Sequence, residues 1–260
     1  MSRTLAMVVA HPDDDAYGVA GTVALHADDP EFRFVLVHAT DGEAGQIHPA
    51  SGAARENLGA VRREEDRRGW RTLGREPDRH EWLGLPDGGL TGAPYDALVD
   101  RVAEILGQER PDVVLTFGPD GITGHPDHIT IGRAATDAFH RFVGDGGSGF
   151  KRLLYGAIRQ SVVDNWSQRR IAQGLEPWDP TKVYHLRGVP DDEFDILVDT
   201  TSVAPRVRAA LLEHRSQWHD VNDGSLTPEE HLKAVSMEAA IIAWPKERPG
   251  RVLSDLFDGL

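Results

Sequence analysis

Three short apolar runs, each followed by a segment of helical composition, constrain the fold of this chain more than any other feature. They occupy residues 5–10, 32–39 and 113–117, with the sequences LAMVVA, FRFVLVHA and VVLTF. Continuous apolar runs of this length are typical of strands buried on both faces of a parallel sheet. Strands that alternate with helices indicate βαβ units with right-handed crossovers. We therefore predict an α/β fold, Rossmann-like, with a mostly parallel sheet and helices on both faces.

The remaining segments fit one domain of 260 residues with a less regular C-terminal part. Helical spacing of apolar residues predicts helices at 16–26, 55–73, 96–106, 128–142, 205–217 and 228–244. Further short strands are expected at 82–85, 153–158 and 194–198. We interpret residues 1–260 as a single domain, with a core over about 1–160 and a C-terminal extension of the sheet over about 161–260.

Composition argues against several classes of function. The formal net charge is −14 and no long basic run occurs, so nucleic acids and anionic membrane surfaces are disfavoured as partners. The chain has no cysteine, which excludes disulfides, thiolate metal sites and cysteine nucleophiles. No stretch approaches the ~20 apolar residues of a membrane span, and we expect a cytoplasmic protein. No GxGxxG follows the first strand, and neither a P-loop nor a GxSxG elbow occurs.

A first cluster of polar side chains follows the first apolar run directly, in the sequence AHPDDD. It contains His11, Asp13, Asp14 and Asp15. Imidazole and carboxylate ligands without thiolate suit Zn²⁺ or a similar divalent ion. A bound cation would also offset the repulsion among three adjacent carboxylates. The alternative is a solvated acidic loop whose aspartates cap the next helix.

A second cluster, within GITGHPDH, follows the run at 113–117 and contains His125, Asp127 and His128. Its alternative explanation is a helix capped by Asp127 with two incidental histidines. In open α/β sheets, ligands bind beyond the carboxyl ends of the strands, where the strand order reverses. Because both clusters follow predicted parallel strands, we expect the two loops to lie side by side and to form one site.

The two motifs together, AHPDD and GHPDH, resemble those of the LmbE-like or PIG-L family of zinc-dependent N-deacetylases. TDGEAG at 40–45, the pair Arg62 and Glu65, PDGGL at 86–90 and HRSQ at 214–217 match the family as well. The resemblance spans roughly residues 5–217, which is most of the chain. It implies that the protein hydrolyses an N-acetyl group on an amino sugar.

The resemblance also implies a role for each matched residue of the two motifs. By analogy, Zn²⁺ is bound by His11, Asp14 and His128, the general base is Asp13, and the group that stabilises the oxyanion or protonates the leaving amine is His125, oriented by Asp127. General chemistry supports these roles, because three protein ligands leave a position open for water whose pKa zinc lowers to roughly 7. A neighbouring carboxylate can accept the proton. The ligand set also accepts other divalent transition metals such as Fe²⁺ or Co²⁺.

Three residues are candidates for substrate binding: Arg62, Asp87 and Asp41. Arg62 and Asp87 match positions that contact sugar hydroxyls in relatives, and Asp41 follows the second predicted strand. A surface ion pair with a nearby glutamate explains Arg62 equally well. Turn formation is the competing explanation for Asp41 and Asp87.

Two positions depart from the family pattern. Asp15 stands where the family usually has glutamate, and Thr123 stands where some mycothiol-pathway relatives have a catalytic tyrosine. For His214 we favour packing over catalysis, because no partner is visible in the sequence. The aromatic residues of the C-terminal third, which could stack on a sugar or simply pack, are Trp166, Trp178 and Trp218.

The leading hypothesis is a metal-dependent hydrolase that removes the N-acetyl group of an N-acetylglucosaminyl-type amino sugar or glycoconjugate, so its partner is a small molecule. Two alternatives remain open. One is a zinc amidase that cleaves a larger acyl group from a sugar-thiol conjugate. The other is a metal-bearing sugar-binding protein without turnover. The sequence also leaves homo-oligomerisation open.

Overall fold

A seven-stranded sheet forms the centre of the computed structural model, which describes residues 3–221 and 226–260. Its strands lie in the order β3-β2-β1-β4-β5-β9-β8. The bounds are β1 Arg3–Val9, β2 Phe32–Thr40, β3 Arg79–Leu85, β4 Val113–Phe117, β5 Arg152–Gly156, β8 Ile196–Asp199 and β9 Met237–Trp244. The neighbours among β1 to β5 are parallel, whereas β9 runs antiparallel to both β5 and β8. A separate parallel pair joins β6 (Ile158–Arg159) to β7 (Gly188–Val189).

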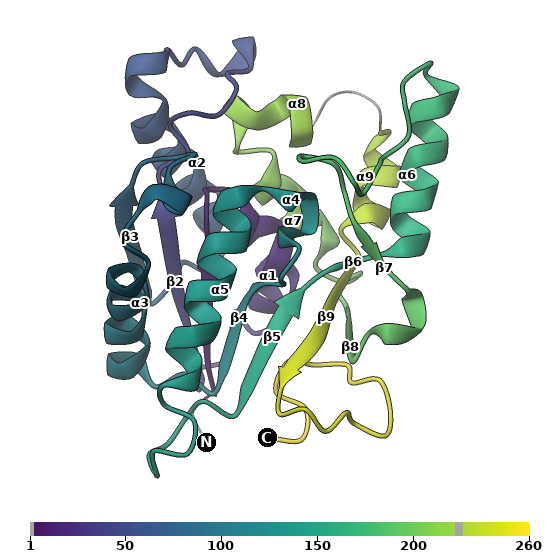
Figure 1. Ribbon diagram of the computed structural model, residues 1–260. Coiled ribbons are helices and arrows are strands. Elements are labelled where there is room, and N and C mark those ends of the chain that lie inside the picture. Colours follow the sequence, from purple (N-terminus) through teal and green to yellow (C-terminus); the bar gives the residue numbers. More distant parts are fainter. Residues whose placement is uncertain (1–2, 222–225) are drawn as a thin grey trace.

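Helices cover both faces of this sheet, as the sequence predicted. On one face α3 packs against α5, and on the other α1, α2 and α7 pack together (Figure 1). The bounds are α1 Asp14–Leu25, α2 Leu58–Leu73, α3 Tyr95–Glu109, α4 Gly121–Gly124, α5 Pro126–His140, α6 Gln160–Ala172, α7 Ala204–Leu211, α8 Trp218–Val221 and α9 Pro228–Ala234. Short 3₁₀ turns are η1 Pro49–Ser51, η2 Arg55–Asn57, η3 Leu90–Gly92, η4 Asp191–Glu193 and η5 Arg215–Gln217.

The apolar runs of the sequence form the buried middle of the sheet. All of residues 4–9 in β1 and all of β4 are buried, because each of these strands is covered by a helical layer on both faces. Apolar side chains also decide which side of a helix is buried. In α3 the 3.6-residue period brings Leu98, Val102 and Leu106 to one side, and all three are buried. Among the described residues, no helix combines the length and the apolar character that a membrane crossing requires.

The strand order reverses between β1 and β4, the two strands that precede the polar clusters. From β1 the chain moves outward through β2 and β3, then returns to the other side of β1 with β4 and β5. At such a switch point the loops that follow the two neighbouring strands turn in opposite directions, and a crevice for a ligand forms between them. The fold therefore places the AHPDDD and GHPDH segments beside each other.

The prediction of one helix over residues 228–244 was wrong. The helix α9 ends at Ala234, and Met237–Trp244 forms β9, which inserts between β5 and β8. The reason is tertiary: β9 covers the open edge of β5, where Ile242 pairs with Leu154 and Ala240 with Gly156. The predicted helix at 205–217 also ends early, at Leu211, and α6 was not predicted at all. The boundary between core and extension near residue 160 stays our interpretation.

Candidate metal centre and active site

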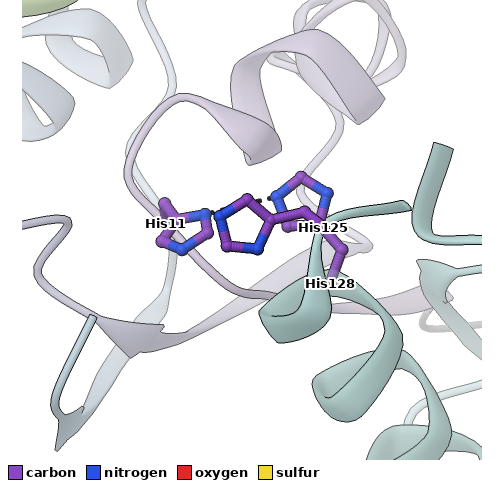
Figure 2. A group of neighbouring side chains, drawn as sticks. All are labelled: His11, His125 and His128. Atoms are coloured by element: carbon purple, nitrogen blue, oxygen red, sulfur yellow. Dashed lines mark hydrogen bonds between the residues drawn. The ribbon is translucent and has the colours of Figure 1, made fainter. Parts of the chain in front are cut away.

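Three ligand-type side chains from the two loops, those of His11, Asp14 and His128, meet at the switch point and are called here the three-ligand group. His11 Nδ1 lies 3.2 Å from His128 Nε2. The Asp14 carboxylate approaches both rings, with Oδ2 3.3 Å from His11 Nδ1 and Oδ1 3.3 Å from His128 Nε2. Figure 2 shows the rings of His11 and His128 turned toward each other, with His125 beside them. The site therefore combines the loop after β1 with the start of α5.

The spacing within the three-ligand group fits a small tetrahedral cation. Ligands bound to zinc at about 2.0–2.1 Å in a tetrahedral arrangement lie about 3.3–3.4 Å from one another. The 3.2 Å between His11 Nδ1 and His128 Nε2 matches this edge length, and each of these nitrogens lies 3.3 Å from a different oxygen of Asp14. Two imidazoles and one carboxylate are also the donor set of catalytic zinc sites. The residues present therefore fit a divalent transition metal.

The outward-facing nitrogens of both histidines lie close to oxygen atoms. His128 Nδ1 lies 3.0 Å from the carbonyl oxygen of Gly121. His11 Nε2 lies 3.0 Å from Asp87 Oδ1 and 3.6 Å from Asp127 Oδ2. Metal-binding histidines usually donate their second N–H to a carboxylate or carbonyl, which fixes the tautomer and turns the free lone pair toward the metal. The His128 ring is therefore held with the nitrogen that faces Asp14 available as a ligand, whereas His11 Nε2 faces two carboxylates without a hydrogen bond.

Asp13 occupies an unusual backbone conformation beside this group. Its φ of 105° is rare for a residue with a side chain, and its N–H donates to Asp15 Oδ1. Asp13 Oδ2 lies 3.1 Å from Nη2 of Arg62. Burial raises the pKa of the Asp13 carboxyl to about 7, although the positive charge of Arg62 favours the ionised form. A carboxyl with a pKa in this range can both accept and return a proton near neutral pH.

His125 is a neutral imidazole with a defined donor. Burial and then the neighbouring His11 and His128 lower its pKa to about 4. It caps α5, because its Nδ1 accepts from the backbone N–H of Asp127 at 3.0 Å. Since Nδ1 is an acceptor, the proton of the neutral ring lies on Nε2. His125 therefore offers one N–H donor at the edge of the three-ligand group.

The carboxylate of Asp127 points away from this ring and connects two other parts of the site. It is fully buried and accepts from the N–H groups of Gly88 at 2.7 Å and Leu90 at 3.1 Å. It also faces His11 Nε2. We expected Asp127 to orient His125, but its hydrogen bond to that ring comes from the backbone. The side chain instead attaches the PDGGL turn to the start of α5.

Comparison with known proteins identifies the family of this chain. The family model described as PIG-L, GlcNAc-PI de-N-acetylase, matches residues 6–139. The chain belongs to the PIG-L family. A 1D-myo-inositol 2-acetamido-2-deoxy-alpha-D-glucopyranoside deacetylase 2 from Saccharopolyspora erythraea is 31% identical over 98% of this chain and 99% of its own length. A deacetylase of the same name, without the numeral, from Kineococcus radiotolerans is 28% identical over 99% of this chain and 83% of its own.

Solved structures show the same fold. The conserved protein TT1542 from Thermus thermophilus superimposes with a TM-score of 0.63 at 23% identity, over 96% of this chain and 98% of that one. The likeness covers more of the chain than the region that the PIG-L family model matches. The mixed α/β fold with a mostly parallel sheet is therefore that of PIG-L family proteins.

The three candidate substrate-binding residues fall in different places around this PIG-L site. Asp87 contacts His11, which helps to hold the pKa of Asp87 at about 2 despite its burial. Arg62 is buried, not on the surface, and its Nη2 also donates to Pro12 O at 2.6 Å. The surface ion pair that we considered for Arg62 is therefore wrong. Asp41 accepts instead from Nε of Arg63 at 2.6 Å, so this candidate has an ion-pair partner outside the three-ligand group.

Glu65 and the HRSQ segment, both of which match the PIG-L pattern, hydrogen-bond to each other near the site. The carboxylate of Glu65 accepts from the N–H and hydroxyl of Ser216, at 2.9 and 2.6 Å. Gln217 donates to the carbonyl of Gln46 at 3.0 Å. These bonds tie the HRSQ segment to α2 and to the loop after β2. His214 is 1% exposed and lies in the same region.

Sequence reasoning missed Tyr184, which the fold brings to the site from the C-terminal part. Its ring meets the His125 ring edge-on with a centroid distance of 5.1 Å. Its N–H donates to the carbonyl of Thr123 at 2.8 Å, and 63% of the residue is exposed. No local motif marks this tyrosine, because its position depends on the chain after α6 folding back over the second motif.

Proposed function

We propose that this protein is a metal-dependent hydrolase that removes the N-acetyl group of an N-acetylglucosaminyl-type amino sugar conjugate. The observation that carries the proposal is the three-ligand group at the switch point, with an arginine-paired carboxyl on one side and a neutral imidazole donor on the other. The amino-sugar substrate is supported by the names of the relatives, which are deacetylases of a 2-acetamido-2-deoxyglucoside.

In this proposal His11, Asp14 and His128 hold a divalent ion such as Zn²⁺. When bound, the ion supplies Lewis acidity and an acidified water. Asp87 and Asp127 face the outer nitrogen of His11, and Gly121 accepts from that of His128, so the ligand nitrogens are oriented before the ion arrives. These outer contacts support positioning roles for Asp127 and Asp87 toward the metal ligands.

Asp13 acts in this proposal as the proton carrier. Its carboxylate accepts a proton from the attacking water as oxygen adds to the acetamide carbonyl. It then delivers that proton to the departing nitrogen, so that the C–N bond breaks to give acetate and the free amine. The guanidinium of Arg62 at 3.1 Å orients the carboxylate and balances its charge. The left-handed backbone of Asp13 supports this role, because such strain concentrates at functional sites.

His125 stabilises the negative charge that develops on the carbonyl oxygen. Its Nε2 carries the proton of the neutral ring, and a donor aimed at a developing oxyanion contributes a few kcal/mol in other hydrolases. Stacking on His128, with centroids 4.7 Å apart and planes 14° apart, holds the ring in place. Tyr184 faces solvent beside it and offers an aromatic surface for the sugar.

The test is acetate release from an N-acetylglucosaminyl inositol by the Asp13→Asn variant. We expect kcat to fall by about 10²–10⁴-fold, the usual contribution of a general acid–base group, while bound metal is unchanged. Asp28→Asn, an exposed aspartate on the surface, serves as the control and should match wild type. Full turnover by Asp13→Asn would refute the mechanism. A panel of N-acyl chain lengths would show whether a larger acyl group is preferred.

A further inference from the structure

A second cluster of ligand-type side chains lies on the sheet face that α2 covers. His38 belongs to β2 and His80 to β3, and Asp66 reaches them from α2. His38 pairs with Trp82 across the strands, and His80 lies two residues before Trp82, so both histidines point to the same face. One ligand atom from each of His38, His80 and Asp66 can be chosen so that all lie within 4.8 Å of one another.

Asp66 is the unusual member of this cluster. It is 1% exposed, and neither of its carboxylate oxygens has a hydrogen-bond partner among the described residues. Its Oδ2 lies 3.7 Å from His80 Nε2, and its Oδ1 lies 3.9 Å from His38 Nε2. These distances are too long for hydrogen bonds. A buried carboxylate without donors is strongly unfavourable unless it is protonated or a cation binds it.

The two imidazoles approach each other beside Asp66. His38 Nδ1 lies 2.9 Å from His80 Nε2. His38 Nε2 lies 3.2 Å from Asp15 Oδ1, which is the usual outer contact of a metal-binding histidine. Trp82 stacks on both rings, at 4.4 Å from His38 and 4.7 Å from His80, and fixes their planes. His80, with 15% side-chain exposure, is the member of the cluster that solvent reaches.

We propose that His38, His80 and Asp66 form a second cation site that takes a transition-metal ion of the Zn²⁺ type. Two imidazoles and a carboxylate favour such an ion over Mg²⁺ or Ca²⁺, which take mainly oxygen ligands. The ion joins α2 to β2 and β3. It also stabilises Asp15, whose Oδ1 accepts the N–H of Asp13. The site is independent of the function proposed above. The competing explanation is a proton shared between Asp66 and Asp15.

The test counts Zn²⁺ equivalents retained by metal-stripped full-length protein after reloading and gel filtration. We expect two equivalents in wild type and one in each of His80→Gln and Asp66→Asn, with circular dichroism verifying that both variants fold. His140→Gln, which changes an exposed histidine outside the cluster, should keep two. His128→Ala should keep one, and the double variant His80→Gln/His128→Ala should keep none.

The outcomes separate the two sites. One equivalent in wild type that persists in His80→Gln and disappears in His128→Ala would overturn the second site and leave the catalytic proposal intact. One equivalent that disappears only in His80→Gln would support the second site and overturn the metal ligands of the proposed function. If Asp66→Asn does not fold, the comparison of wild type with His80→Gln alone decides between two ions and a shared proton.

Discussion

The Asp13 carboxylate and the Arg62 guanidinium form a largely buried pair, with 3.1 Å between Oδ2 and Nη2. The same arginine donates to the carbonyl oxygens of Pro12 and Gly42, at 2.6 and 3.0 Å. Arg62 therefore holds both the side chain and the backbone of the loop in which Asp13 adopts a positive φ. A buried guanidinium that fixes three acceptors at once is a rigid support for a proton-transfer group.

Replacing Arg62 should therefore change the pH profile as well as the rate. In Arg62→Met we expect kcat/KM to fall by about 10–100-fold, because a displaced catalytic group can cost about 10²-fold. Arg62 lowers the pKa of Asp13, so its loss raises that pKa. Because Asp13 must be ionised to accept a proton, the acid limb of kcat/KM against pH should move to higher pH. Arg63→Gln, which breaks the neighbouring pair with Asp41, is the matched control. An unmoved acid limb in Arg62→Met would contradict the role.

Gly132 allows α5 to approach the end of β4, and an added methyl group should destabilise the protein. A Cβ at this position would lie 2.5 Å from the carbonyl oxygen of Phe117 and 3.0 Å from its Cβ. Because the nearest atom belongs to the backbone, relief requires α5 to move. We expect Gly132→Ala to lower the free energy of unfolding by about 1–3 kcal/mol. Urea denaturation measures this, with Gly250→Ala as the control because nothing lies within 4 Å of its added Cβ. Equal stability of the two variants would show that α5 has room.

The sequence predicted the parts of this fold that local patterns determine. The apolar runs that became β1, β2 and β4 were recognisable because these strands are buried on both faces. β9 was not, because AAIIAW after a capped helix reads equally well as more helix. Its strand conformation is decided by pairing with β5 and β8, which are distant in the sequence.

In the site, too, the residues in local motifs were predicted, and the residues whose partners depend on tertiary contacts were not. His11, Asp14 and His128 stand in motifs next to predicted strands, and the switch point brings them together. The partners of the Asp127 side chain could not be predicted. They are backbone N–H groups in the PDGGL turn, about 40 residues earlier, and almost every residue type carries such a donor, so the sequence does not identify them. Asp66 and His80 were missed for a similar reason, since their contact depends on the packing of α2 over β3.

Glu238 should make stability depend on pH. Its carboxylate accepts from Gly21 N at 2.6 Å and from the N–H and hydroxyl of Thr22 at 2.9 and 2.6 Å. Burial nevertheless raises its pKa from the ordinary 4.5 to about 7. Because the folded-state pKa is the higher one, the stabilising contribution of the bound proton is fully present below pH 4.5. It is lost as the pH rises through about 7, and it corresponds to about 3 kcal/mol at most.

The comparison of wild type with Glu238→Gln measures this effect. From pH 5 to pH 8, we expect the free energy of unfolding of wild type to decrease relative to that of the variant, whose side chain does not ionise. Urea denaturation at each pH gives the difference. Glu229→Gln, which changes an exposed glutamate of α9, should follow wild type across the range. A constant difference between wild type and Glu238→Gln would show that Glu238 keeps the same charge throughout.

Tyr184 should affect substrate binding more than turnover. The segment that carries it is fixed on the second motif by two backbone bonds, from Tyr184 N to Thr123 O and from Arg187 N to Ile122 O, both 2.8 Å. The φ of Tyr184 is 64°, so its exposed ring is held in place by tertiary contacts rather than by local preference. An aromatic face worth about 1 kcal/mol toward a sugar implies that Tyr184→Ala raises KM by roughly 5–10-fold with kcat nearly unchanged.

Tyr184→Phe distinguishes stacking from a role of the hydroxyl. If the ring face binds the sugar, the phenylalanine variant should keep the wild-type KM and kcat, since only the phenol oxygen is lost. Leu175→Ala, another exposed apolar residue of the same C-terminal segment, controls for nonspecific loss of surface. Steady-state kinetics with an N-acetylglucosaminyl inositol measures all three variants. A fall in kcat for Tyr184→Phe with KM unchanged would contradict the stacking role of Tyr184. It would mean instead that the hydroxyl takes part in the reaction.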